Sequence, residues 1–133
     1  MVRMTATYTG GLHCKVRHEP SESILETDAP KDNMGLGERF SPTDLMAAAL
    51  ASCILTTMGI VAQRDQVSLE GAQADVEKEM ATSPTRKVGA LRVTVTLPAH
   101  ISPDYRRKLE HAAHHCPVHK SLHPDIDAPI IFR

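Results

Sequence analysis

Aromatic residues and net charge are what this sequence most clearly lacks. Its 133 residues include no tryptophan, two phenylalanines and two tyrosines, so aliphatic side chains and methionine must build the core. The formal net charge of −1 provides no basic surface for binding phosphate backbones. Aromatic side chains on which single-stranded bases could stack are missing as well. These two absences argue against a nucleic-acid-binding protein.

Cysteines are few and odd in number. Cys14, Cys53 and Cys116 lie far apart, which is not the pattern of a secreted domain held together by disulfides. The first ten residues, MVRMTATYTG, contain no apolar segment of the kind that a signal peptide carries. We therefore expect a cytoplasmic protein, in which a cysteine serves as packing, as a metal ligand or in catalysis.

Repeats, linkers and low-complexity segments are also absent, and the length fits a single domain over residues 1–133. Alternating apolar residues predict strands, and capping signals predict helices. The expected strands are residues 2–9, 12–18, 23–27, 67–80, 90–97 and 128–133, and the expected helices are residues 42–64, 103–116 and 117–122. Gly10-Gly11 is the predicted two-residue turn of the first hairpin. The order β-β-β-α-β-β-α-α-β is typical of an α+β fold.

The first predicted helix is long and carries almost no charge. Ser41 is its expected N-cap, Pro42 its first residue, and Asp44 the capping-box partner. The uncharged part, residues 45–62, is just long enough to span a membrane, but many of its residues are small or hydroxylated. A helix that is apolar on all sides is more often buried in a core. Because this chain is small, we expect a second subunit to cover part of the helix.

The second predicted helix begins at Ser102, with Pro103 at the first helical position and Asp104 in the first turn. Pro117 should end it, because the residue before a proline is pushed out of the helical conformation. The segment PVHKSL can then form a short third helix with Cys116 as its N-cap.

Cys116 lies in an electropositive stretch. His114, His115, His119 and Lys120 are its neighbours in sequence. Such a setting at a helix start lowers the pKa of a thiol. The other interpretation, a cysteine that ends the apolar stripe of the preceding helix, stays open.

Cys53 lies in the middle of the first helix, about 16 Å from its start at 1.5 Å per residue. The helix dipole cannot activate a thiol at that distance. From the helix alone, inert packing is the more common role, and a reactive Cys53 thiolate would need a cation from elsewhere in the fold. Cys14 alternates with Leu12 and Val16 on the apolar side of a strand, so we expect it in the core.

Eight histidines raise a metal-binding alternative. The motif HHCPVH places Cys116 and His119 at metal-ligand spacing, and His13 with Cys14 can add ligands from the hairpin. A zinc site normally shows two paired clusters, however, and only one is visible here. A solvated, histidine-rich helix end explains the pattern without a metal. We therefore expect neither a metal nor a cofactor.

The order of these motifs resembles a known family. A β-hairpin, a proline-started helix with a central cysteine (SPTDLMAAALASC) and a distal HHCPVHKSL are similar to the OsmC/Ohr superfamily over nearly the whole chain. The resemblance implies an intertwined α+β homodimer with two active sites at the subunit interface. It also implies thiol-dependent reduction of organic hydroperoxides, with Cys53 as the peroxidatic thiol, Cys116 as the resolving thiol and an external dithiol as reductant.

Two positions depart from the best-known members of that family. Those members carry an arginine just after the hairpin glycines and a glutamate ten residues before the first cysteine. Here the two positions are Leu12 and Thr43, which resembles the OsmC-like and YhfA-like branches. The nearby charged residues that could replace the pair are Arg17, Glu38, Arg39 and Asp44. We favour Arg39 as the stabiliser of the thiolate, with Glu38 beside it.

An apolar pocket lined by Met46, Leu50 and Ile60 would suit an organic peroxide better than hydrogen peroxide. The sequence thus leads us to expect a homodimeric, thiol-dependent peroxidase of oxidative stress defence that binds neither nucleic acid nor a membrane. Two alternatives stay open. One is a non-catalytic protein of the same fold that binds small molecules or electrophiles, and the other is a metal-binding protein that uses Cys116 and His119.

Overall fold

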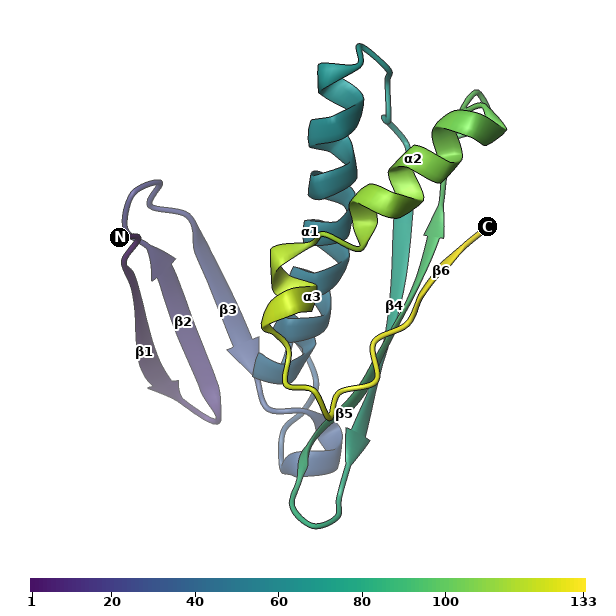
Figure 1. The fold of residues 1–133 in the computed structure, drawn as a ribbon. Coiled ribbons are helices and arrows are strands. Elements are labelled where there is room, and N and C mark those ends of the chain that lie inside the picture. Colours follow the sequence, from purple (N-terminus) through teal and green to yellow (C-terminus); the bar gives the residue numbers. More distant parts are fainter. The chain divides into compact units, whose positions relative to one another are not determined.

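The structure is a computed structural model that describes all residues 1–133, and the chain divides into two compact units, Met1–Met46 and Ala47–Arg133. In chain order the elements are β1 (Met4–Gly10), β2 (His13–His18), β3 (Ile24–Asp28), the 3-10 helix η1 (Lys31–Asn33), α1 (Pro42–Arg64), β4 (Gln73–Ala81), β5 (Lys87–Thr96), α2 (Pro103–Ala113), α3 (Pro117–Ser121) and β6 (Ile130–Phe132) (Figure 1). The α+β class is confirmed, and the elements follow the predicted order with η1 added.

The first unit is built on an antiparallel sheet in the order β1-β2-β3. Ala6 lies opposite Val16, and Val16 lies opposite Leu25, so one face of the sheet carries apolar side chains. The predicted alternation is therefore present, but this face is not buried. The buried residues of the unit are all polar, namely Thr27, Asp28 and Ser41. Unit 1 has no apolar core of its own.

The first hairpin turns one residue later than predicted. Gly10 pairs with His13, so the two turn residues are Gly11 and Leu12, with φ angles of 60° and 64°. Gly10 has a φ of 94° and lies next to a shift in strand register, as in a β-bulge. Positive φ at both central residues is the requirement of a primed hairpin turn, which Leu12 meets without being glycine.

The second unit contains a sheet in the order β4-β5-β6. β5 runs antiparallel to β4 and parallel to β6, with Val93 opposite Ile130. The predicted apolar face of β5 is confirmed, because Leu91, Val93 and Val95 are fully buried. Together with α1 and α2 this face forms one core, made of Ala47, Leu50, Ile54, Met58, Ala62, Val88, Leu91, Val93, Val95, Leu97, Leu109, Ala113 and Cys116.

β4 begins at Gln73, six residues after the predicted start. The intervening chain ends helix α1 instead of forming a strand. Gln66 adopts a left-handed conformation with a φ of 55°, and the N–H of Val67 donates to the carbonyl oxygen of Ala62. This pattern is a Schellman cap, which uses the carbonyl groups left free at a helix end. A turn at Gly71, with a φ of 89°, then leads into β4.

Helix α1 begins and ends where the sequence predicts. The N–H of Asp44 donates to Oγ of Ser41 at 3.0 Å, and the N–H of Ser41 donates to a carboxylate oxygen of Asp44 at 2.8 Å. The helix is long and apolar enough to cross a membrane by length and composition. Core helices of soluble proteins pass the same test, and Leu50, Ile54 and Met58 of α1 are fully buried in the core of unit 2. We therefore interpret α1 as a core helix.

Candidate active site at Cys53 and Cys116

Cys53 is held on α1 with its side chain only partly buried. It lies beside the fully buried residues Leu50 and Ile54, at the margin of the core. One helical turn further on, Oγ1 of Thr57 is 3.9 Å from the sulfur of Cys53. The hydroxyl group can donate to the sulfur when the thiol is ionised.

Cys116 lies between α2 and α3 and is fully buried. It is the N-cap of α3, as predicted, and its sulfur accepts a hydrogen bond from the N–H of His119 at 3.5 Å. Pro117 is the first residue of α3 and prevents α2 from continuing through Cys116. The second cysteine is therefore fixed in position by the end of one helix and the start of the next.

Both cysteines are free thiols, and each shifts the pKa of the other. Burial on its own would raise the pKa of Cys53. Hydrogen bonds from the thiol of Cys116, the backbone N–H of Val118 and the hydroxyl of Thr57 outweigh burial and lower it. Burial raises the pKa of Cys116, and its hydrogen bond to Cys53 raises it further. The two thiols thus differ, because the pKa of Cys53 is shifted down and that of Cys116 is shifted up.

His119 contributes its backbone to the surroundings of Cys116, and the metal-ligand pair that the sequence left open stays a hypothesis. His119 directs its backbone N–H to the sulfur of Cys116, whereas its ring atom Nε2 lies 2.8 Å from the carbonyl oxygen of Ala128. Of the other histidines nearby, His115 contacts His111, with their Nε2 atoms 3.2 Å apart.

The residues predicted to line a substrate pocket have different surroundings. Leu50 is fully buried in the core of unit 2, whereas Met46 and Ile60 are 37% and 47% exposed. Their role in substrate binding stays a prediction.

The charged residues predicted to assist Cys53 lie in unit 1. There the Nε of Arg39 donates to the carboxylate of Glu26 at 2.9 Å, and the backbone N–H of Glu38 donates to Asp28 at 3.1 Å. Leu12 is a turn residue, and the hydroxyl of Thr43 lies 3.2 Å from that of Ser41. The assignment of Arg39 and Glu38 to the site likewise stays a prediction.

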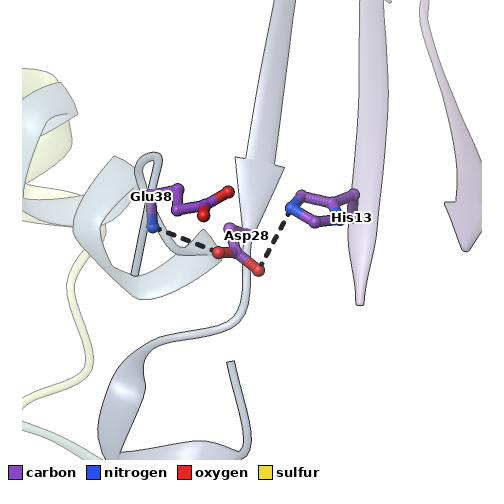
Figure 2. Close-up of side chains that lie close together, drawn as sticks. All are labelled: His13, Asp28 and Glu38. Carbon is purple, nitrogen blue, oxygen red and sulfur yellow. Dashed lines mark hydrogen bonds and ion pairs between the residues drawn. The ribbon is translucent and has the colours of Figure 1, made fainter. Parts of the chain in front are cut away.

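Cys14 is not in the core, contrary to our expectation. It is only partly buried and lines a cavity of about 320 Å³ within unit 1, together with His13, Glu38 and Arg39. The prediction was wrong because the apolar face of this sheet is not covered, so alternation along β2 did not imply burial. The same part of unit 1 holds a group that sequence reasoning missed, formed by His13, Asp28 and Glu38 (Figure 2).

The fold and the paired thiols define an α+β protein with a two-cysteine site, and comparison with known proteins identifies its family. The family model for OsmC-like proteins matches residues 35–129. A solved structure of a candidate osmotic stress induced and detoxification response protein from Psychrobacter arcticus 273-4 is 40% identical. The two align over 100% of this chain and 96% of that one, with a TM-score of 0.93. The chain therefore belongs to the family of OsmC-like proteins, which confirms the resemblance seen in the sequence.

More distant solved structures share the fold. The organic hydroperoxide resistance protein OsmC from Legionella pneumophila is 21% identical and aligns over 99% of this chain and 96% of that one, with a TM-score of 0.79. OhrB, an organic hydroperoxide resistance protein of Bacillus subtilis, is 20% identical and aligns over 100% and 98%, with a TM-score of 0.71. No curated protein sequence matches this chain.

Proposed function

We propose that this protein is a cytoplasmic, thiol-dependent peroxidase that reduces organic hydroperoxides through Cys53 and Cys116. The observation that carries the proposal is a pair of free thiols that influence each other and whose pKa values shift in opposite directions. A reactive thiolate next to a thiol that keeps its proton is the arrangement that sulfenate formation followed by disulfide formation requires. The organic hydroperoxide resistance proteins among the solved structures of this fold support the choice of substrate.

The chemistry needs no cofactor. The Cys53 thiolate attacks one peroxide oxygen, the O–O bond breaks, and the leaving alkoxide takes a proton and departs as an alcohol. Cys53 is then a sulfenic acid. The thiol of Cys116 attacks its sulfur, water leaves, and a disulfide forms. An external dithiol reduces the disulfide by thiol–disulfide exchange and becomes a disulfide itself.

The proposal includes a homodimer. Unit 1 exposes apolar side chains on both ends of β1, with Met4 59% and Tyr8 65% exposed, and it buries only polar residues. A three-stranded sheet without a buried apolar face is not stable alone. In the proposed homodimer, a second copy of the chain buries the apolar face of this sheet, and the active sites lie near the interface.

The test is to treat the reduced protein with excess cumene hydroperoxide and to measure its intact mass and its free thiols. We expect the loss of two hydrogen atoms and a disulfide between Cys53 and Cys116 in a peptide map. The Cys53→Ser variant should keep its remaining thiols, since no sulfenic acid forms. The Cys116→Ser variant should form a sulfenic acid that dimedone traps and that excess peroxide oxidises to sulfinic acid.

Cys14→Ser is the matched control, because it removes a partly exposed thiol outside the proposed pair. This variant should form the disulfide at the rate of the unchanged protein. If Cys53 and Cys116 both stay reduced in excess peroxide, the peroxidase proposal fails and the non-catalytic alternative gains support.

A further inference from the structure

A second group of functional side chains lies in unit 1, apart from the cysteine pair in sequence. His13 begins β2, Asp28 ends β3, and these two residues are partners in the strand register. Glu38 comes from the loop before α1. One nitrogen or oxygen atom from each residue lies within 4.8 Å of the others, and Figure 2 shows the carboxylate of Asp28 between the other two side chains.

The two oxygen atoms of Asp28 have different roles. Oδ2 accepts the backbone N–H of Glu38 at 3.1 Å, and this bond ties the loop before α1 to the end of β3. Oδ1 is buried and has no hydrogen-bond partner, although Asp28 as a whole is only 1% exposed. A buried carboxylate oxygen without a hydrogen-bond partner is unfavourable, and most buried polar atoms in proteins form at least one hydrogen bond.

His13 lies at ion-pair distance from Oδ1 of Asp28 but forms no hydrogen bond with it (Figure 2). Its Nε2 lies 3.4 Å from Oδ1 of Asp28, outside the range of about 2.7–3.2 Å of an ordinary N–H···O hydrogen bond. The imidazole ring of His13 lies close to the hairpin turn, since a Cβ atom added at Gly11 would be 3.2 Å from Nδ1. The distance between Nε2 of His13 and Oδ1 of Asp28 suits two ligand atoms of one metal ion. Two ligand atoms bound at 2.0–2.1 Å to one tetrahedral metal ion lie about 3.4 Å apart.

The negative charges of this group also favour a bound cation. The carboxylate of Asp28 accepts the backbone N–H of Glu38, a hydrogen bond that favours its charged form. Glu38 adds a second carboxylate within the same 4.8 Å. The next residue, Arg39, pairs through its Nε with Glu26 at 2.9 Å. Two carboxylates that share a small space are favourable with a cation between them.

We propose that His13, Asp28 and Glu38 form a binding site for a divalent transition-metal ion such as Zn²⁺. An imidazole nitrogen among the ligands favours this class of ion over Mg²⁺ or Ca²⁺, which prefer oxygen ligands alone. Glu38 is the exposed member and can close the remaining distance by rotating its side chain. His13 and Glu38 also line the cavity of about 320 Å³, so a fourth coordination position would open into it.

The test is isothermal titration of the reduced, full-length protein with Zn²⁺ alone. We expect one site per chain, with binding at least ~10-fold weaker in His13→Gln and in Glu38→Gln, since each variant removes a direct ligand. Glu38→Gln is the sharper variant, because Glu38 supports the loop through its backbone N–H, which the substitution keeps. Zn²⁺ should raise the melting temperature of the unchanged protein and not that of Glu38→Gln.

Two control variants separate this site from other ligands. Glu22→Gln removes a carboxylate of unit 1 outside the three, one that pairs with Arg17, and His111→Gln removes one member of the exposed histidine pair. Both should bind Zn²⁺ as the unchanged protein does. The proposal is overturned if Zn²⁺ does not bind, if Glu38→Gln binds it equally well, or if binding is lost in His111→Gln or after alkylation of the thiols. None of these outcomes depends on whether Cys53 reacts with peroxide.

Discussion

The acidity of Cys53 illustrates how single hydrogen bonds define this site. The sequence left open which charge would stabilise a thiolate at the middle of a helix. In unit 2 the stabilising groups are neutral: the thiol of Cys116, the N–H of Val118 and the hydroxyl of Thr57. A thiolate that accepts several hydrogen bonds is favoured over the protonated form even where burial opposes it.

Replacing Thr57 by valine should therefore make Cys53 less reactive at neutral pH. The variant loses one hydrogen-bond donor, so the pKa of Cys53 rises towards its ordinary value. The rate of alkylation of Cys53 by iodoacetamide follows the fraction of thiolate, and its midpoint in pH should move upwards. The measurement is the alkylation rate of Cys53 across a pH series, followed by peptide mass spectrometry.

Thr56→Val is the matched control for this prediction. Thr56 is exposed, and its hydroxyl donates to the carbonyl oxygen of Ser52 at 2.8 Å, away from Cys53. Its midpoint should equal that of the unchanged protein. An equal shift in both variants would show that the effect comes from the helix rather than from the hydrogen bond.

The motifs around the two cysteines were visible in the sequence, but most of the groups that interact with their thiols were not. Cys53 and Cys116 stand in distinctive motifs, and Pro117 marks Cys116 as a helix N-cap. Val118 acts through its backbone N–H, a group that nearly every residue has, so the sequence could not indicate its role. Thr57 stood out only as a weakly polar neighbour one turn from Cys53, and its contact distance follows from the packing of α1.

At the scale of elements, the start of α1 depends on its capping box. Ser41→Ala removes the oxygen atom that accepts the N–H of Asp44, and it leaves that donor without its partner. We expect the free energy of unfolding to fall by ~1 kcal/mol, which is the typical cost of losing such a cap. Urea denaturation followed by circular dichroism measures the change.

Ser52→Ala is the control in the same helix. Ser52 is exposed and donates only to the carbonyl oxygen of Ala49 in its own helix, at 3.2 Å. Because alanine has the higher helix propensity, this substitution should leave stability unchanged or raise it by a few tenths of a kcal/mol. A loss in Ser52→Ala as large as that in Ser41→Ala would contradict the capping argument.

Helix boundaries were easier to predict than strand boundaries. Ser41-Pro42 and Ser102-Pro103 mark helix starts with local chemistry, and both starts are as predicted. The hairpin turn was misplaced because two adjacent glycines allow positive φ at either position. The structure puts Leu12 at a φ of 64° instead, a conformation that costs about 1–2 kcal/mol for a residue with a Cβ atom.

Hydrogen bonds of the Leu12 backbone with residues outside the turn favour this position of the turn. The carbonyl oxygen of Leu12 accepts the N–H of Ala29, and the N–H of Leu12 donates to the hydroxyl of Tyr8. Such contacts between strands are not visible in local propensity. The group of His13, Asp28 and Glu38 was missed for the same reason, since it depends on the register that places His13 opposite Asp28.

At the scale of the whole molecule, burial is divided unequally along the chain. Every buried apolar residue lies in Ala47–Arg133, and Met1–Met46 buries only polar side chains. Helix α1 also keeps an exposed stripe that includes Ser52, Thr56 and Ile60. A chain of this size with uncovered apolar surface on a sheet is expected to bury it in an interface.

The proposed homodimer can be tested on the apolar face of the first sheet. Light scattering after size-exclusion chromatography should give about 29 kDa, twice the 14.5 kDa of one chain. Ala6 and Thr7 are neighbours in the middle of β1, both exposed, and their side chains point to opposite faces. Ala6→Glu places a carboxylate opposite Val16 on the apolar face, whereas Thr7→Glu places one opposite Lys15 on the polar face.

Ala6→Glu should therefore raise the dissociation constant of the dimer at least ~10-fold, or about 1.4 kcal/mol, because a charge would be buried without a partner. Thr7→Glu should leave the dimer intact, since its carboxylate stays in water beside a lysine. If the unchanged protein has the mass of a single chain, the dimer proposal is wrong. If both variants dissociate equally, the apolar face of the first sheet is not the dimer interface.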